Sequence, residues 1–227
     1  MGCDRVDREG FCDECLSLLE WLDPSTSCSR CGAPIASEAL LRGGKCAACI
    51  RRPPRYTQAV AALRYTGPLA RSIVLWKYEG QQAFSTHFAG LLCDWTSGSA
   101  PKWWEKIQAI VPAPLHPRTF RSRGFSPPEE LAEPLADAFA IPYLPRTLYK
   151  VRHTLPQARL DRETRIVNLS MSMQVFDCSL VEGRTIAVVD DVMTTGATVD
   201  ECARALITAG ADKVYGLVLA RQSECDS

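Results

Sequence analysis

The chain contains no long hydrophobic run and no excess of charge of one sign. None of its apolar stretches approaches the roughly 20 residues of a membrane-spanning helix, so we expect no membrane insertion. Its first residues lack the apolar core of a signal peptide, and Val6 replaces the Ser or Thr of a myristoylation signal. The 26 basic and 26 acidic residues give a net charge of zero, which removes any global attraction to nucleic acid or membranes. These absences favour a cytoplasmic protein.

Histidine is also scarce. The three histidines, His87, His116 and His153, lack the spacing of a metal site and have no obvious Ser or Cys partner, so we interpret them as structural. The chain has no low-complexity tract and no repeat beyond its cysteine pairs. With 227 residues, 46% of them hydrophobic, it is long enough for one sizeable domain and a small one.

Cysteine, in contrast, is abundant and clustered at the start. Seven of the 11 cysteines lie in the first 49 residues. Six of them form the C-x-x-C pairs Cys12/Cys15, Cys28/Cys31 and Cys46/Cys49. The gaps of 12 and 14 residues between pairs suit a tetrahedral zinc ion held by four thiolates. Disulfides and a redox motif are the alternatives, but the chain shows no sign of export and no βαβ pattern surrounds the pairs.

Three pairs do not complete two four-ligand sites. A C-x-x-C partner for Cys3 would lie one residue before Met1, so we expect the natural protein to begin further upstream; otherwise Cys3 is an incidental thiol. The prolines of the segment Arg51-Arg52-Pro53-Pro54-Arg55 indicate a stiff linker. We therefore expect a cysteine-rich zinc module over residues 1–54 and a second domain over residues 55–227.

Strands alternate with helices in that second domain. The pattern predicts strands over residues 58–65, 107–115, 185–190 and 213–220, and helices over residues 68–76, 83–95, 127–139 and 199–209. Pro134 is expected to break or kink the third of these helices. The alternation favours an α/β fold with a mainly parallel sheet, in which ligands bind at the carboxyl ends of the strands.

The most informative segment is the run from Val188 to Thr198, V-V-D-D-V-M-T-T-G-A-T. An apolar strand leads into Asp190 and Asp191, and a Thr/Gly loop then opens onto a helix. Free N–H groups at a helix N-terminus bind phosphate, Gly196 allows close approach, and the threonines add hydroxyl donors. The plain alternative is an acidic strand end followed by a Thr-capped helix.

A second candidate anion-binding segment follows the strand near residue 111. Arg118, Arg121 and Arg123 fall within six residues of a loop that ends at Gly124. Guanidinium groups bind phosphate oxygens in bidentate fashion. Alone, such a loop is more often a solvated surface, but here it accompanies a phosphate motif.

Taken together, these segments resemble the ComF/GntX family, and the acid pair with T-T-G-A-T resembles the phosphoribosyl-pyrophosphate (PRPP) signature of type I phosphoribosyltransferases. The resemblance covers nearly the whole chain. It includes C-S-R-C-G, C-A-A-C running into P-P, Lys77, V-P-A-P-L-H, R-S-R-G-F and a segment from Thr154 to Asn168. One departure is Ser126-Pro127-Pro128, which stands where the family usually has Asn-Gln, so acceptor binding near this loop is expected to differ.

The resemblance implies a phosphoribosyltransferase-like parallel sheet flanked by helices, preceded by a double zinc ribbon. Cys28, Cys31, Cys46 and Cys49 would form one complete structural zinc site, and Cys3, Cys12 and Cys15 would be three of the four ligands of another. Asp190 and Asp191 would bind the ribose hydroxyls, directly or through Mg²⁺. The implied PRPP-binding set also includes Met193, Thr194, Thr195, Gly196, Ala197, Thr198, Arg118, Arg121, Arg123 and Gly124.

Two functions follow from the resemblance. The first is transfer of a phosphoribosyl group from PRPP to an acceptor, normally a nitrogen. The second is a non-catalytic protein of DNA uptake that binds PRPP or another ribose 5-phosphate ligand and contacts single-stranded DNA or an uptake protein. The balanced charge of residues 1–52 gives little support for nucleic-acid binding by the cysteine-rich module alone.

Overall fold

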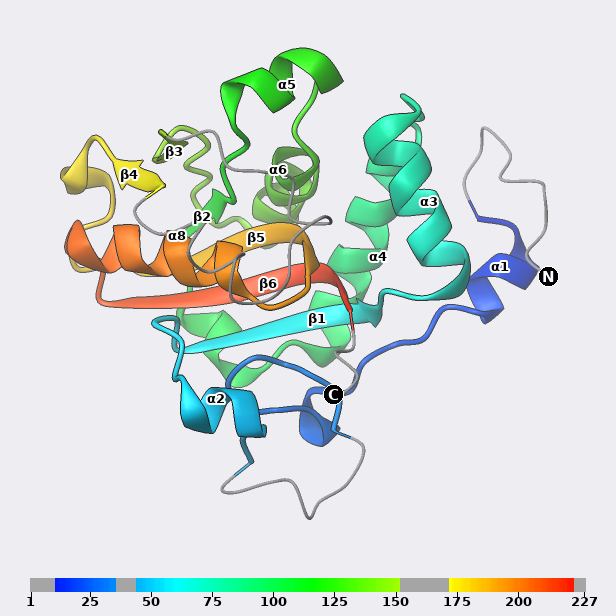
Figure 1. Ribbon diagram of the computed structural model, residues 1–227, viewed down its shortest axis with the longest axis horizontal. Helices are drawn as coiled ribbons and strands as arrows, with labels where there is room; N and C mark the ends of the chain where they lie inside the picture. The colour runs from blue at the N-terminus through cyan, green and yellow to red at the C-terminus, as the bar shows by residue number, and fades with distance from the viewer. Residues whose placement is uncertain (1–10, 36–43, 152–171, 223–227) are drawn as a thin grey trace.

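The computed structural model describes residues 11–35, 44–151 and 172–222 (Figure 1). Cys3 and the whole segment from Thr154 to Asn168 therefore lie outside the described residues. The strands are β1 (Gln58–Arg64), β2 (Ala109–Pro112), β3 (Leu148–Lys150), β4 (Met173–Val175), β5 (Thr185–Met193) and β6 (Lys213–Arg221). The α-helices are α1 (Asp13–Ser17), α2 (Ala47–Arg51), α3 (Gly67–Tyr78), α4 (Phe84–Ser99), α5 (Pro117–Arg123), α6 (Pro127–Phe139) and α8 (Ala197–Thr208).

A parallel sheet forms the centre of the molecule. Its strand order is β1-β6-β5-β2, and every neighbouring pair is parallel. β3 and β4 form a separate antiparallel pair. The central strands are buried along almost their whole length, as expected for a parallel sheet that is covered on both faces. The sheet and its flanking helices confirm the expected α/β fold class.

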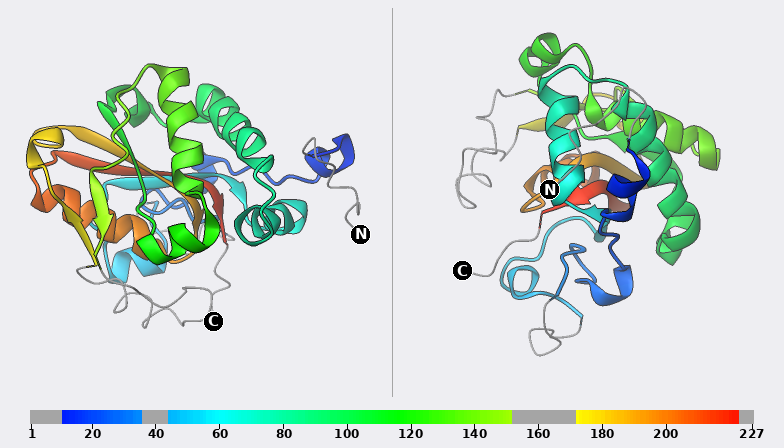
Figure 2. Two further views of the ribbon diagram at one scale, coloured as in Figure 1. Left: turned by 90° about the horizontal axis from the view of Figure 1, so that it is seen from above. Right: turned by 90° about the vertical axis from the view of Figure 1, so that its right-hand side faces the viewer.

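The two faces of the sheet carry different cores. On one face, α3, α4 and α6 bury Trp76, Phe88 and Leu131 against inward residues of the strands. On the other face, α8 packs on β5 and β6, and three of the module's cysteines belong to the same apolar cluster. Figure 2 shows α4 and α6 on one side of the sheet, with α8 and α2 on the other.

Most expected elements are present, and the differences lie at their ends. Helix α6 runs unbroken from Pro127 to Phe139 with Pro134 inside it, so the expected break is absent. β5 continues past the acid pair to Met193, because pairing with β6 extends as far as Arg221. Within the part of the chain that the structure describes, no helix combines the length and apolarity needed to cross a membrane.

Candidate functional site

The acid pair, Asp190 and Asp191, lies in the last part of β5. Each residue is only 7% exposed. Since side chains alternate along a strand, the two carboxylates leave it on opposite sides. Lys77, in the last turn of α3, pairs with Asp191 at a distance of 2.7 Å between Nζ and Oδ1. The charges of Asp191, Lys77 and Lys150 of β3 all act on Asp190.

Burial dominates the electrostatics of Asp190. It raises the pKa of this carboxyl to about 7, and repulsion from Asp191 adds to the effect. Lys77, the backbone N–H of Asp191 and Lys150 act in the opposite direction. The pKa of Lys150 is itself lowered, mainly by burial. Asp190 therefore changes its charge near neutral pH.

The loop predicted to bind phosphate, residues 194–198 (the phosphate loop), follows directly and opens onto α8. Gly196 adopts φ 81°, a left-handed conformation that favours glycine. A Cβ there would lie 2.5 Å from Met193 Cε and 3.0 Å from the hydroxyl of Tyr56. The backbone N–H of Ala197 donates to Thr195 Oγ1 at 3.3 Å. The loop is thus folded tightly over buried side chains.

A small cavity of about 10 Å³ lies at this loop, room for a single water molecule. Asp190 and residues of the phosphate loop line it together with Met193. The Met193 side chain is buried under Gly196, so this residue can offer a ligand its backbone but not its side chain. The structure therefore brings together the acid pair and the predicted phosphate-binding residues.

The predicted arginine loop is in fact a helix. Arg118, Arg121 and Arg123 belong to α5, which Gly124 ends with φ 86°. His116 caps this helix, because its Nδ1 accepts a hydrogen bond from the backbone N–H of Arg118 at 3.1 Å. Residues three apart on a helix are neighbours, so Arg118 and Arg121 lie on one side of α5, whereas Arg123 lies on another.

Of these arginines, Arg121 lines a cleft of about 550 Å³ between α5, α6 and β3. Lys150 lies in the same cleft, along with the carboxylates Glu129 and Glu133. Arg123 lies instead over the ring of Tyr78, 5.3 Å from its centre. The cleft therefore contains both Arg121, a predicted anion-binding residue, and Lys150, whose charge acts on Asp190.

The cysteine centre, formed by Cys28, Cys31, Cys46 and Cys49, lies on the α8 side of the sheet. All four Sγ atoms lie within 4.8 Å of one another, and those of Cys31 and Cys46 are 3.8 Å apart. A tetrahedron with Zn–S bonds of 2.3 Å has edges of about 3.8 Å. The backbone N–H of Cys46 also donates to Cys28 Sγ at 3.2 Å. These four residues could hold a metal ion, and their geometry fits zinc.

The Cys12/Cys15 pair lies elsewhere. It belongs to the segment around α1, where Phe11 packs against Phe84 and Phe88 of α4 with ring centres 5.9 Å apart. Figure 1 shows α1 beside α3, whereas α2, which carries Cys49 of the cysteine centre, lies below β1. With Cys3 outside the described residues, a second metal site at this pair stays a prediction.

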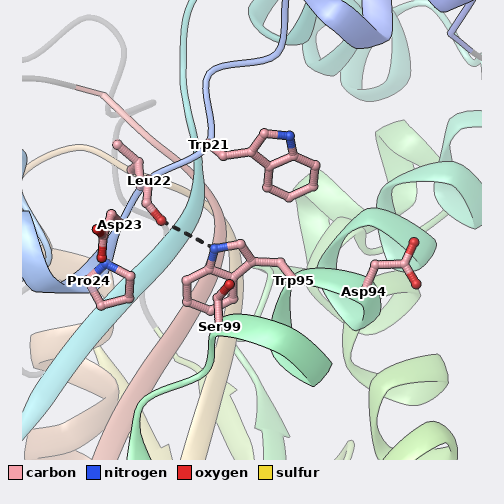
Figure 3. Close-up of a pocket in the computed structure, with 7 residues that line it drawn as sticks. All are labelled: Trp21, Leu22, Asp23, Pro24, Asp94, Trp95 and Ser99. Carbon is pink, nitrogen blue, oxygen red and sulfur yellow. Dashed lines mark hydrogen bonds between the residues drawn. The ribbon is translucent and has the colours of Figure 1, made fainter.

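A separate cavity of about 630 Å³ lies between the N-terminal segment and α4 (Figure 3). Trp21, which is 48% exposed, and the buried Trp95 form its apolar walls, and the Trp95 indole N–H donates to the carbonyl of Leu22 at 3.3 Å. No residue of the acid pair or the phosphate loop lines it. Although this cavity is large, it is therefore separate from the predicted site.

Sequence reasoning assigned no role to several residues around these sites. They are Lys77, which pairs with Asp191; Lys150, which is half-buried near Asp190; Tyr56, which lies against Gly196; and Arg221, whose Nη2 lies 3.6 Å from Cys31 Sγ. Arg221 carried a signal, since it is a charged residue directly after the apolar run of residues 217–220.

Curated proteins similar to this chain include two with informative names. "DNA utilization protein YhgH" of Salmonella typhimurium is 30% identical over 214 residues, which cover 93% of this chain and 90% of that protein. "Competence protein F" of Haemophilus influenzae is 28% identical over 223 residues, which cover 96% of this chain and 93% of that protein. No protein-family model matches the chain.

Two enzymes are among the solved structures with a partial likeness to this chain. An allosteric regulatory enzyme of purine biosynthesis is 20% identical with a TM-score of 0.39, covering 59% of this chain and 25% of that chain. Adenine phosphoribosyltransferase from Thermoanaerobacter pseudethanolicus is 18% identical with a TM-score of 0.37, covering 64% of this chain and 83% of that chain.

Proposed function

Since this chain belongs to the ComF family, which includes competence protein F and the YhgH proteins, we propose that it binds PRPP with Mg²⁺ and transfers the phosphoribosyl group to a nitrogenous acceptor. One observation carries the proposal. The buried acid pair of β5 adjoins a glycine-containing loop that opens onto the N-terminus of the 12-residue helix α8.

The phosphate loop would hold the 5′-phosphate of the ribose. The N-terminal N–H groups of α8 lack partners within the helix, and the helix dipole favours an anion there. Thr194, Thr195 and Thr198 are half-buried and carry hydroxyl donors. The left-handed conformation of Gly196 turns the backbone sharply at this point. The cavity is small, so the loop would open to admit a phosphate group.

The acid pair would bind the ribose hydroxyls, directly or through Mg²⁺. Carboxylate oxygens are ligands that Mg²⁺ prefers, so the donor set fits the ion. In the ligand-free protein Lys77 neutralises Asp191, and it would have to release Oδ1 before a divalent ion could take that oxygen. When bound with PRPP, the ion would supply positive charge to the departing pyrophosphate.

The cleft beside Asp190 would hold the leaving group and the acceptor. Arg121 and Lys150 supply positive charge for pyrophosphate in this cleft. As the bond from the anomeric carbon to the pyrophosphate oxygen breaks, the acceptor nitrogen would attack that carbon and release its proton to water, while pyrophosphate would leave with the bonding electron pair. Glu129 lines the same cleft, and burial raises its pKa above the usual value for a glutamate. Positioning and electrostatics would supply most of the rate.

We also propose that the cysteine centre holds a structural zinc ion. Four thiolate ligands leave no open coordination position for chemistry. A segment with few large apolar residues gains most of its folding free energy from such an ion.

The names of the relatives favour a second candidate, a non-catalytic protein of DNA uptake. In that case PRPP, or another ribose 5-phosphate ligand, would be a regulatory ligand, and single-stranded DNA or an uptake protein would be the partner. The discriminating assay incubates the protein with PRPP, Mg²⁺ and a panel of bases. Release of pyrophosphate supports the transferase, whereas PRPP binding without turnover supports the accessory role.

The binding site itself is tested by calorimetry with PRPP and Mg²⁺. We expect the Asp190→Ala, Asp191→Ala double variant to weaken binding at least about tenfold, because each lost charged hydrogen-bonding group costs roughly 1.5–3 kcal/mol. Gly196→Val should do the same, because its side chain would meet Met193 and Tyr56. Gly183→Val is the matched control, since Gly183 also has a positive φ, of 68°, but a Cβ there meets nothing within 4 Å. Unchanged PRPP affinity in both site variants would refute the assignment.

A further inference from the structure

Arg221 is a buried cation beside the cysteine centre. It ends β6 and is only 4% exposed. Its Nη2 lies 3.6 Å from Cys31 Sγ, while Nε and Nη1 have no hydrogen-bond partner among the described residues. Burying a guanidinium group with unsatisfied donors is costly unless a negative charge compensates it.

The cysteine centre supplies that charge once a metal is bound. Zinc with four thiolates carries a net double negative charge, which also has to be compensated in a buried place. Groups just outside the ligand shell commonly donate to the sulfurs and tune the stability of the site. Arg221 is placed to do this for Cys31.

Arg221 and Tyr56 connect the cysteine centre to the phosphate loop. Arg221 is the register partner of Met193, the residue just before the loop, and the N–H of Gln222 donates to the Met193 carbonyl at 3.0 Å. Tyr56, 2% exposed, belongs to the apolar cluster that contains Cys28, Cys31 and Cys49. Its hydroxyl lies against Gly196 of the loop.

A third connection reaches the first turn of α8. Arg55 is the last residue of the proline linker, which begins where α2 ends. Both its backbone N–H and its guanidinium group bind the carboxylate of Asp200, the second contact at 3.0 Å. The cysteine centre and the phosphate loop are thus linked by a short path of packed residues.

We propose that Arg221 is the counter-charge of the metal–thiolate centre and that, through Arg221 and Tyr56, zinc occupancy sets the conformation of the phosphate loop. The part concerning the loop rests on the proposed PRPP binding. Arg221 and Tyr56 are positioning residues, and PRPP affinity depends on the metal although the metal is not part of the PRPP site. Because coupling is reciprocal, PRPP tightens zinc binding by the same factor by which zinc tightens PRPP binding.

The counter-charge is tested by chelator competition for zinc without PRPP. Arg221→Met is expected to weaken zinc binding about tenfold or more, and Arg221→Lys, which keeps the charge, to restore most of it. Arg64→Met is the matched control, because Arg64 occupies the neighbouring register position on β1 and pairs with Glu20. Equal zinc affinity in the wild type and Arg221→Met would overturn the assignment.

The coupling is tested by PRPP calorimetry at saturating zinc and after zinc removal. We expect PRPP affinity to fall at least about fivefold on zinc removal, the lower end of ordinary coupling. At saturating zinc, Arg221→Met and Tyr56→Leu should show a similar loss, while Arg221→Lys stays within about twofold of the wild type. If zinc removal also abolishes the circular dichroism signal, these zinc-loaded variants decide the question. Wild-type PRPP affinity in both Arg221→Met and Tyr56→Leu would overturn the coupling.

The two proposals fail in different ways. If zinc-loaded wild-type protein binds neither PRPP nor ribose 5-phosphate, the proposed function is wrong, while the chelator competition still tests Arg221 as counter-charge. If PRPP binds with an affinity that zinc does not change, the proposed function stands and the coupling is wrong.

Discussion

At the scale of single residues, Asp190 and Asp191 are adjacent in the sequence but have different electrostatic surroundings. Asp191 has Lys77 within 2.7 Å. Among the described residues no cation lies that close to Asp190, and burial raises its pKa to about 7. The difference follows from the alternation of side chains along β5, which directs the two carboxylates to different neighbours.

Asp190 should make the stability of the protein depend on pH. Its pKa rises from 3.8 in the unfolded chain to about 7 in the folded protein. The folded state therefore binds this proton more tightly, and the stabilisation is complete below pH 3.8 and is lost as the pH rises through 7. Asparagine does not titrate, so the Asp190→Asn variant does not lose this stabilisation as the pH rises. We expect the stability of Asp190→Asn relative to wild type to increase by roughly 1–3 kcal/mol between pH 4 and pH 8.

Urea denaturation at several pH values measures this effect. Asp212→Asn serves as the control, because the Asp212 side chain is 58% exposed. A relative stability of Asp190→Asn that stays constant from pH 4 to pH 8 would contradict the prediction.

The Lys77–Asp191 pair should matter for stability as well. Its side chains are 16% and 10% exposed, so screening by water is weak. Lys77→Met leaves the Asp191 carboxylate without its cation and should destabilise the protein by about 2–4 kcal/mol. The Lys77→Met, Asp191→Asn double variant should recover part of this loss, since no uncompensated charge remains.

A double-mutant cycle with thermal denaturation at pH 7.5 measures the coupling energy. The Arg64–Glu20 pair is the comparison, and with side chains 32% and 55% exposed it should contribute no more than about 1 kcal/mol. Strictly additive losses at Lys77 and Asp191 would show that the pair does not interact significantly.

At the scale of elements, helices α5 and α6 form where sequence signals pointed another way. Three arginines before a glycine suggested a loop, but Pro117 is favourable in the first turn of a helix and Gly124 ends the helix in the left-handed conformation. In α6, Pro134 was expected to break or kink the helix, and the helix is unbroken. The buried residues Leu131, Ala132 and Leu135 hold both of its halves on the sheet.

Pro134 should therefore reduce the stability of α6 without preventing its formation. Proline cannot donate the hydrogen bond to the carbonyl of Glu130, four residues earlier, and Pro134 is exposed. Pro134→Ala should raise the free energy of unfolding by about 1–3 kcal/mol. Pro68→Ala, at the second residue of α3 where no such bond is lost, should change it by less than about 1 kcal/mol. Urea denaturation distinguishes the two, and an unchanged or lower stability of Pro134→Ala would show the reasoning to be wrong.

At the scale of the whole molecule, the N-terminal segment packs against the second domain at several places. The N–H of Leu22 donates to the carbonyl of Ala62 in β1 at 2.9 Å, and the N–H of Ala59 donates to the carbonyl of Arg30 at 2.8 Å. Gly32 lies so close to Ala59 that a Cβ there would be 2.7 Å from its carbonyl oxygen. The boundary at residue 54 stays a prediction, but the cysteine centre and β1 share one apolar core.

The number of zinc ions per chain should reflect the position of the Cys12/Cys15 pair, which lies apart from the cysteine centre. Purified protein should contain one tightly held zinc ion at the cysteine centre, with a second, weaker ion where Cys3, Cys12 and Cys15 bind one, giving between one and two ions per chain. Removing the tight ion should lower the melting temperature by at least about 10 °C, because binding energy at such sites contributes to folding. Metal analysis and calorimetric melting measure both.

Cys31→Ser should lose the tight ion, whereas Cys178→Ser, at an exposed position, should keep it. If the purified protein contains no zinc and melts at the same temperature with and without a chelator, the cysteine-rich segment is not a zinc module.

Local sequence determined much of this protein. Hydrophobic strand patterns predicted the four strands of the main sheet, and the order of acid pair, Thr/Gly loop and helix predicted the elements of the site, because each depends on residues adjacent in the chain. The spacing of the C-x-x-C pairs likewise predicted a zinc site, since two residues between cysteines let both thiolates reach one ion, and the family resemblance selected the two pairs that form the cysteine centre.

Only the tertiary structure decided which distant residues meet these local features. Lys77 reaches Asp191 across more than 110 positions of sequence, and Arg221 reaches Cys31 across 190. The packing of α3, and of β6 beside β5, creates these contacts, and no pattern of adjacent residues encodes them. The burial that raises the pKa of Asp190 likewise depends on all the elements packed around it. Charge and proximity at the site are therefore properties of the assembled fold, while the type and order of its elements are properties of the sequence.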